Sequence, residues 1–202
     1  MCLFEAPKSN LNFNLLRVLS LDKFSTMKKV LVFGGSNSKK SINKQLAVYT
    51  SSLLADAEVN IVDLNDFPLP IYGIDHELEN GIPNKVKEFD SLIQEADGII
   101  VSLAEHNGSY AAVFKNLLDW LSRNEAKNFH DKPMMVMATS PGGRGGISVL
   151  EAALSRFPRH GAGAITSFSL PSFQDNFQKG ALSGEILSQL KSKVAEFEGT
   201  LN

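Results

Sequence analysis

The stretch that decides the fold is Lys28–Asn43, which reads KKVLVFGGSNSKKSIN. Residues 30–33 (VLVF) form an apolar run rich in β-branched and aromatic side chains, as is typical of a parallel strand buried on both faces. Gly34 and Gly35 follow, and glycine tolerates the positive φ angles of a tight turn. The stretch therefore predicts a buried strand that runs into a loop.

A helix is expected after this loop, because apolar residues recur on a 3.6-residue period at Ile42, Leu46, Tyr49 and Leu53. The loop itself, residues 36–43, is rich in serine, asparagine and lysine. Free N–H groups and the positive end of the macrodipole at a helix N-terminus favour an anion, and small polar side chains add donors. Phosphate is the simplest ligand for such a loop.

The loop lacks the two commonest phosphate-binding signatures. The P-loop pattern needs Gly-Lys before its last serine, whereas here Lys39 and Lys40 precede Ser41. The dinucleotide pattern GxGxxG fails because Ser36 follows Gly35. ATP and NAD are therefore disfavoured as tightly held ligands. The alternative interpretation is an ordinary turn in which Ser41 caps the helix.

Composition indicates an ordinary globular protein of one domain, with 202 residues, 43% hydrophobic and 21% charged. The net charge of -2 gives no general attraction to nucleic acid or acidic membranes, and no run approaches the ~18 consecutive apolar residues of a membrane span. Cys2 is the only cysteine, so an intrachain disulfide and a thiolate metal cluster are excluded. We expect a cytoplasmic protein with neither nucleic acid nor membrane as a partner.

Residues 1–26 precede Met27, which stands at the natural start of the first strand. Glu5 and Arg17 disfavour a signal peptide, because the first lies in what should be a basic region and the second interrupts the apolar segment. Two interpretations remain, an upstream translation start or an arm that packs on a neighbouring subunit. The expected domain is residues 27–202.

The rest of the chain alternates strands with helices. Strands are expected at residues 59–64, 99–103, 133–140 and 164–170, and helices near residues 86–96, 114–121, 147–157 and 186–201. A long proline-rich loop, residues 65–83, either covers a ligand or packs against another subunit. This alternation predicts a parallel sheet with helices on both faces.

The expected fold class is α/β, a three-layer sandwich with a five-stranded parallel sheet in the order 2-1-3-4-5. In such sheets ligands bind beyond the carboxyl ends of the strands where the order reverses, here between strands one and three. Three loops rich in small residues follow strands one, three and four, at residues 34–43, 104–110 and 140–146. We therefore expect these loops to converge on one crevice.

Three strings of residues carry a resemblance to a known family. The first fits the pattern GSxRxxSxN at Gly35, Ser36, Ser41 and Asn43, with Ser38 in the arginine place. The second fits PEYNxSxPxxLKNxxDW at Glu105, Asn107, Ser109, Lys115, Asn116, Asp119 and Trp120, and departs from it at Ala104, His106, Ala111 and Phe114. The third is SPGGRGG at residues 140–146. From residue 28 onward the chain resembles the NAD(P)H-dependent FMN reductases, a flavodoxin-like family that includes quinone, chromate and azo-dye reductases.

The resemblance implies an enzyme that passes a hydride from NADPH or NADH through bound FMN to a quinone, free flavin or similar small oxidant. It implies no metal and no protein nucleophile, and it implies a homodimer or a homotetramer. By the same resemblance, the FMN phosphate would be held by Ser36, Ser38, Ser41, Ile42 and Asn43. The flavin ring would be lined by Glu105, His106, Asn107, Gly108, Ser109, Ser140, Gly142, Gly143 and Gly145.

Arg144 is the candidate for contact with the phosphates of the pyridine nucleotide, and the alternative is an exposed loop arginine. A flavodoxin-type electron carrier is the main alternative function, although such carriers are usually far more acidic. A receiver-type signalling module would need an acidic cluster after the first strand, which residues 32–36 (VFGGS) lack. The four histidines are scattered without helical pairing, so no zinc site is expected.

Overall fold

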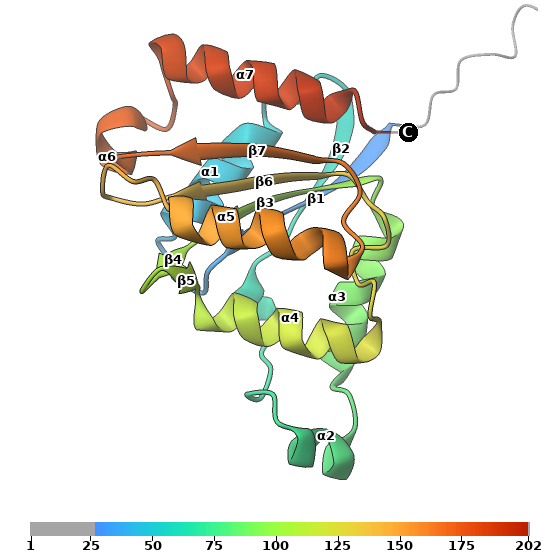
Figure 1. Cartoon of the computed structure of the whole chain (residues 1–202). Helices are drawn as coiled ribbons and strands as arrows, with labels where there is room; N and C mark the ends of the chain where they lie inside the picture. The colour runs from blue at the N-terminus through green and yellow to red at the C-terminus, as the bar shows by residue number, and fades with distance from the viewer. Residues whose placement is uncertain (1–26, 202) are drawn as a thin grey trace, which may run out of the picture.

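The computed structural model describes residues 27–201, and the two interpretations of residues 1–26 lie outside this range. Five parallel strands form the main sheet in the order β2-β1-β3-β6-β7 (Figure 1). Their bounds are β1 (Lys28–Gly35), β2 (Ala57–Ile61), β3 (Gly98–Leu103), β6 (Met134–Thr139) and β7 (Ile165–Leu170). The order confirms the predicted 2-1-3-4-5 arrangement of a flavodoxin-like fold.

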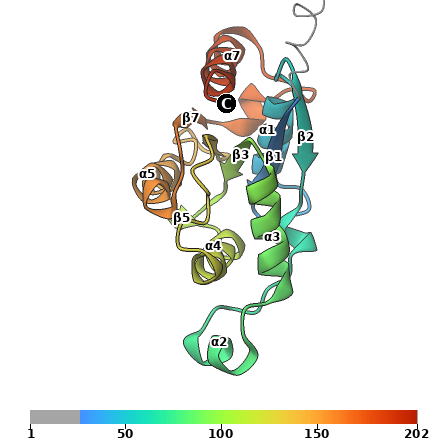
Figure 2. The same cartoon turned by 90° about the vertical axis from the view of Figure 1, so that its right-hand side faces the viewer.

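Helices cover both faces of this sheet, as Figure 2 shows in the view along it. On one face lie α3 (Asn84–Glu95), α4 (Ala112–Asn124) and α5 (Ile147–Arg156), and on the other lie α1 (Ile42–Ser51) and α7 (Gly184–Glu198). The short elements are α2 (Ile74–Asn80), α6 (Phe173–Asn176), η1 (Leu64–Asp66) and η2 (Phe157–His160). The result is the expected three-layer sandwich.

The apolar run of β1 is explained by burial on both faces. Leu31 and Phe33 pack into the core beneath α3, α4 and α5, whereas Val30 and Val32 pack into the core beneath α1 and α7. All four side chains are at most 1% exposed. Because neither face of this strand meets water, no polar alternation appears in its sequence.

The second strand lies earlier in the chain than predicted, at Ala57–Ile61 instead of residues 59–64. It is an edge strand that pairs only with β1, and its last paired residue is Ile61, opposite Val32. The chain then bends, because the Asp63 side chain accepts a hydrogen bond from the backbone N–H of Asn65 and caps η1. The apolar residues Val62 and Leu64 thus pack on the core from the turn after β2 and do not extend the strand.

The segment predicted as a loop over residues 65–83 contains helix α2, so the prediction of a purely irregular segment was wrong. This helix buries none of its residues, and it therefore shows no apolar stripe that would reveal it. Its signals are instead Asp75 and Glu77 in the first turn and Gly81, with φ of 72°, just after the last turn.

Residues 67–83, here called the arm, extend away from the body of the molecule in Figures 1 and 2. The arm is attached to α4: Trp120 Nε1 donates to the Pro70 carbonyl at 2.8 Å, and Asn116 Oδ1 accepts from the Tyr72 N–H at 2.8 Å. Trp120 is fully buried and belongs to the core beneath α3, α4 and α5. Further out, Glu77 of α2 pairs with Arg123 of α4 at 2.9 Å, so the arm is held to α4 at two places while Ile71, Ile74 and Leu78 stay exposed.

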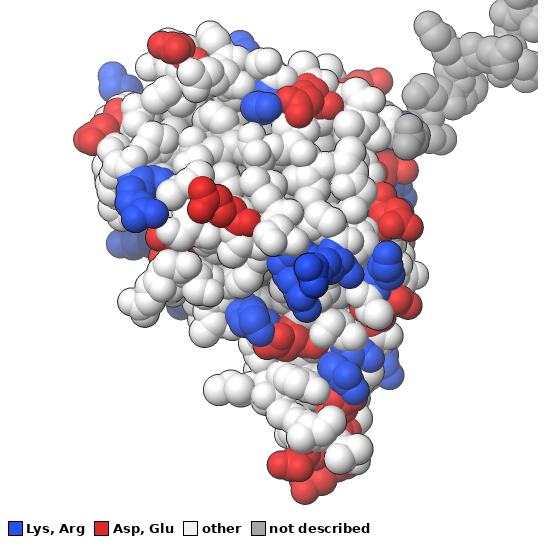
Figure 3. All heavy atoms as spheres, in the orientation of Figure 1, with Lys and Arg blue, Asp and Glu red and all other residues white. Residues whose placement is uncertain are grey.

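Charged side chains on the face shown in Figure 3 alternate in sign without forming an extended basic surface. Among residues 27–201, no helix is both long enough and apolar enough to cross a bilayer. The same residues contain no group of three or more His, Cys, Asp or Glu side chains placed to hold a metal ion.

Candidate functional site

The loop between β1 and α1 directs hydroxyl groups into a small cavity. Ser36 Oγ accepts from the Ser38 N–H at 3.2 Å, Ser38 Oγ accepts from the Lys40 N–H at 3.3 Å, and Ser41 Oγ accepts from the Lys44 N–H at 3.1 Å. Each hydroxyl uses a lone pair in these contacts and keeps its own hydrogen to donate. The loop thus combines ordered geometry with three free O–H donors.

Gly34 allows β1 to end close against the first turn of α1. A Cβ at this position would lie 2.7 Å from the Lys44 backbone nitrogen and 2.8 Å from its Cα. Gly34 and Gly35 are absent from the residues with positive φ, so the tight-turn reason expected from the sequence does not apply. Close packing of strand and helix is the reason for Gly34, and this packing holds Ser41 at the mouth of the cavity.

Asn43 joins three elements of the fold. Its Oδ1 accepts from Ser102 Oγ at 2.7 Å and from the Thr139 N–H at 3.0 Å, and its Nδ2 donates to the Thr139 carbonyl at 3.2 Å. The residue is 3% exposed. Its amide is engaged with β3 and β6, so the geometry gives Asn43 a positioning role, and the phosphate contact implied by the resemblance stays a prediction for this residue of the lining.

The loops after β1, β3 and β6 converge as expected, because one cavity of about 190 Å³ draws its walls from all three. Its lining is Ser36, Ser38, Lys40, Ser41, Ile42, Asn43, Ala104, Glu105, His106, Thr139, Ser140 and Pro141. Four of these residues were not among the site residues expected from the sequence: Lys40, Ala104, Thr139 and Pro141. Lys40 had a usable signal, since it lies inside the first motif directly before Ser41.

The loop after β3 is a β-hairpin and not the irregular loop expected from the sequence. Strands β4 (Glu105–His106) and β5 (Ser109–Tyr110) are antiparallel. Between them Asn107 and Gly108 have φ of 53° and 74°, which are the two positive values of a type I′ turn. The Asn-Gly pair is the strongest short signal for this turn. The turn residues are exposed and, with Ser109, lie outside the lining of the cavity.

Glu105 fastens this hairpin to α5. Its carboxylate accepts a hydrogen bond from the Val149 N–H at 3.0 Å, in the first turn of that helix. A negative charge is favourable there because it meets unpaired N–H groups and the positive end of the helix dipole. The side chain therefore positions the hairpin, and it also forms part of the cavity lining.

The loop after β6 has an open part and a packed part. Gly142 and Gly143 are exposed, and a Cβ on either would meet no atom within 4 Å. Gly145 is buried with φ of 59°, and a Cβ there would lie 2.9 Å from the Pro171 nitrogen. Packing against the end of β7 thus explains Gly145, whereas Gly142 and Gly143 leave space beside the cavity.

Two further features concern charge near the site. Lys44 is bound to Asp63 at 2.6 Å, and this hydrogen bond lowers the pKa of the Asp63 carboxyl. Lys39 and Lys40 are exposed, and no ion pair with either is found among residues 27–201. Arg144 is exposed and donates to Ser148 Oγ at 3.2 Å, which agrees with the alternative of an exposed loop arginine.

Comparison with known proteins identifies the family. Residues 28–175 match the family model described as NADPH-dependent FMN reductase. The chain belongs to this family. The recognition made from the three sequence motifs is thereby confirmed.

Two relatives illustrate the similarity. The chain is 35% identical over 119 residues to a 2-hydroxy-1,4-benzoquinone reductase of Burkholderia sp., a match that spans 58% of this chain and 63% of the relative. It is 31% identical over 123 residues to a quinone reductase of Escherichia coli (strain K12), with the same two coverages. The matched region thus spans somewhat under two thirds of the length of these relatives.

A solved structure shows the same fold. FerB, described as a flavoenzyme NAD(P)H:(acceptor) oxidoreductase from Paracoccus denitrificans, superposes with a TM-score of 0.68 at 24% sequence identity. The superposition covers 86% of this chain and 97% of FerB. At this identity the likeness shows a shared fold and carries no statement about substrates.

Proposed function

We propose that this family member is an FMN-dependent oxidoreductase that takes a hydride from NADPH or NADH and passes it to a quinone, a free flavin or a similar small oxidant. The observation that carries the proposal is the cavity at the junction of the loops after β1, β3 and β6. This is the position where the strand order reverses and where open α/β sheets bind their ligands. The names of the relatives, two of them quinone reductases, support the same substrate class.

The residues of the cavity fit the phosphate end of FMN. Ser36, Ser38 and Ser41 offer three hydroxyl donors, and Lys40 adds a positive charge. The one carboxylate in the lining, that of Glu105, is engaged by the α5 N-terminus and does not oppose an anion. A volume of about 190 Å³ is smaller than a typical ligand pocket, so it suits the phosphate and the chain attached to it, with the flavin ring at the open surface of the hairpin.

Bound FMN would supply the redox chemistry, since its ring accepts a hydride from a nicotinamide and gives electrons to an oxidant. The chain's own residues bind and orient. The type I′ hairpin presents backbone groups at a fixed angle, because Glu105 anchors it to α5. No atom lies within 4 Å of a Cβ on Gly142 or Gly143, and we propose that the nicotinamide and the oxidant use this open space in turn.

If the nicotinamide and the oxidant occupy the same space beside the flavin in turn, the steady-state kinetics of the enzyme test the proposal. With the FMN-loaded protein, double-reciprocal plots of rate against NADPH at several quinone concentrations should be parallel, as in ping-pong kinetics. Intersecting lines would show that both substrates bind at the same time, and the hypothesis of one shared binding space would then be wrong. Absence of turnover with NADPH and with NADH would favour the flavodoxin-type carrier.

Replacing Ser41 with alanine should weaken FMN binding by roughly 10- to 100-fold, because a hydrogen bond to a charged group contributes about 1.5 to 3 kcal/mol. Titration of the apoprotein with FMN measures this. Turnover at saturating FMN should change much less. Ser91→Ala, at an exposed position on α3, is the control and should leave the dissociation constant unchanged. The same dissociation constant for both variants would remove Ser41 from the site.

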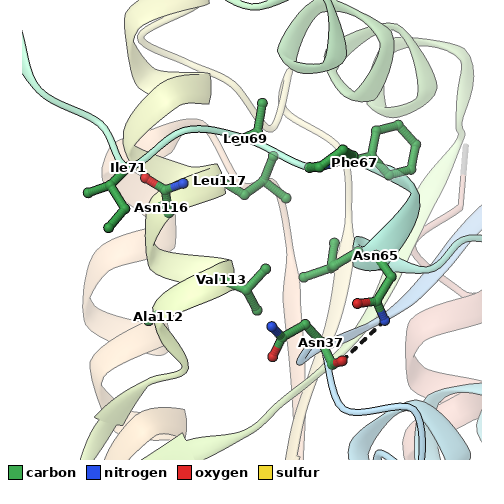
Figure 4. A pocket seen from close by; sticks show the side chains of 11 residues that line it. Asn37, Asn65, Phe67, Leu69, Ile71, Ala112, Val113, Asn116 and Leu117 are labelled. Carbon is green, nitrogen blue, oxygen red and sulfur yellow. Dashed lines mark hydrogen bonds between the residues drawn. The ribbon is translucent and has the colours of Figure 1, made fainter. Parts of the chain in front are cut away.

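We further propose that two copies of the chain associate through the arm. Ile71 is 88% exposed, Leu78 is 77% exposed and Ile74 is 52% exposed, which is unusual for large apolar side chains. Beside the base of the arm lies a cavity of about 330 Å³, walled by Phe67 and Leu69 of the arm and by the first turns of α4 (Figure 4). A second copy would offer the same projecting side chains and the same cavity, as a two-fold symmetric interface requires.

Leu78→Glu should convert the dimer into a monomer at micromolar concentration, because a charge would have to enter an apolar contact, and a loss of about 1.4 kcal/mol already weakens association tenfold. Light scattering after size exclusion measures the mass. Asn80→Glu adds the same charge on the same exposed helix outside the apolar patch and should leave the dimer intact. Equal dimer masses for both variants would exclude the arm as the interface.

A further inference from the structure

A second hollow lies next to the candidate FMN cavity, on the outer side of α1. Its volume is about 480 Å³, and it runs between α1 and the segment after α6. We call it the α1 groove, and its lining is Lys39, Lys40, Ser41, Lys44, Gln45, Val48, Tyr49, Ser52, Phe177 and Gly180. Lys40 and Ser41 also line the FMN cavity, so the two hollows adjoin at the phosphate-binding end of that cavity.

The α1 groove is basic at one end and aromatic at the other. Lys39 and Lys40 lie at the basic end without an ion-pair partner in the described part of the chain, whereas Lys44 is neutralised by Asp63. At the other end the Tyr49 and Phe177 rings meet edge to face with centroids 5.3 Å apart. Phe177 is in turn stacked on another ring of α6, which keeps this aromatic surface in place. A ligand that joins a phosphate to a flat ring matches both ends.

We propose that the α1 groove binds the adenosine end of NADPH, with the 2′-phosphate at Lys39 and Lys40 and the adenine against Tyr49 and Phe177. The proposal rests on the proposed function, in which the nicotinamide meets the flavin ring at the hairpin. Because the α1 groove adjoins the phosphate end of the FMN cavity, a nucleotide lying alongside bound FMN would place its adenosine end in the groove. Two phosphates would then lie close together, and two unpaired lysines are the complement that they need.

Lys39 lines only the α1 groove, whereas Lys40 lines both the groove and the FMN cavity. The position of Lys39 therefore separates the proposed adenosine site from the FMN phosphate site. If the lysines served FMN only, a cation confined to the groove would have no ligand. The inference therefore predicts that this chain prefers NADPH to NADH, and that Lys39 carries a large part of the preference.

The test measures binding to the FMN-loaded protein by calorimetry with two probes, 2′,5′-ADP and 5′-AMP. The wild type should bind 2′,5′-ADP more tightly than 5′-AMP. Lys39→Gln should weaken 2′,5′-ADP binding by about 5- to 10-fold, as expected for loss of one exposed charged contact to phosphate. The same variant should change 5′-AMP binding less than twofold, and FMN binding should be unaffected. Gln45→Glu, which adds a negative charge to the groove on an exposed helix position, should also weaken 2′,5′-ADP binding.

Lys191→Gln removes an exposed lysine from α7 and serves as the control that should match the wild type with both probes. Equal affinity of the wild type for 2′,5′-ADP and 5′-AMP would overturn the inference. So would a parallel loss of FMN and 2′,5′-ADP affinity in Lys39→Gln, because the lysine would then serve the flavin. Selective 2′,5′-ADP binding without flavin reduction by NADPH or NADH would instead overturn the proposed function and leave the groove assignment standing.

Discussion

Replacing Gly34 with alanine should lower both the free energy of unfolding and the affinity for FMN. The added Cβ would lie 2.7 Å from the Lys44 backbone nitrogen, so α1 must move away from β1. Overpacking of this kind costs about 1 to 3 kcal/mol. Ser41 would move with the helix, and we expect FMN affinity to fall more than about tenfold as its hydroxyl leaves its position. Urea unfolding of the apoprotein and FMN titration measure the two effects.

Gly142→Ala is the matched control for this experiment. Its Cβ would meet no atom within 4 Å, and the residue is not among those with positive φ, so the free energy of unfolding should stay within a few tenths of a kcal/mol of the wild type. If Gly34→Ala is as stable as Gly142→Ala and binds FMN as tightly as the wild type, the close approach of β1 and α1 does not hold the site.

Asn43→Ala should be the most destabilising of the substitutions considered for the site. It removes three hydrogen bonds and leaves the Ser102 hydroxyl and the Thr139 N–H and carbonyl buried without their partners. A buried polar group without a partner costs about 1 to 3 kcal/mol, so we expect a total loss of about 3 to 5 kcal/mol. Urea unfolding of the apoprotein measures this loss in the absence of any ligand.

Asn65→Ala is the control, because Asn65 is exposed and its side chain bonds only within a surface turn and to the Asn37 carbonyl. Its loss should be below about 1 kcal/mol. An Asn43→Ala apoprotein as stable as the wild type, with weakened FMN binding, would support the phosphate contact implied by the sequence resemblance over the positioning role.

The sheet and its strand order could be predicted because a strand buried on both faces leaves a strong trace in the sequence. Residues 30–33 and 99–103 are apolar or small almost throughout, and their side chains alternate between two cores. Short crossovers with helices then leave few possible orders. The edge strand β2 is placed less well, because none of its five residues is buried and only one neighbouring strand fixes its register.

Two of the elements that the sequence prediction missed lack a core face. Helix α2 buries no side chain, and the hairpin of β4 and β5 has only two residues in each strand. Periodicity cannot detect either element. Local signals were nevertheless present, namely Asn107-Gly108 for the hairpin turn and the acidic first turn of α2.

The position of the site followed from topology, whereas the direction of individual side chains did not. Motif spacing brought Ser41, Asn43 and Glu105 to the same crevice, and the structure gives them different tasks. Ser41 keeps a free hydroxyl at the cavity, Asn43 binds backbone of β6, and Glu105 binds the α5 N-terminus. Whether a polar side chain turns to the ligand or to a neighbouring element depends on contacts far apart in the chain, which one sequence does not display.

The most direct test of the central claim is anaerobic stopped-flow absorbance of the FMN-loaded protein mixed with NADPH, and in parallel with NADH. We expect the visible absorbance band of the bound flavin to bleach at least as fast as steady-state turnover, and mixing with a quinone should then restore it. NADPH should reach half-maximal bleaching rate at the lower concentration, as Lys39 and Lys40 in the α1 groove imply. A flavin that stays oxidised with both nucleotides over the time of a turnover would contradict the account.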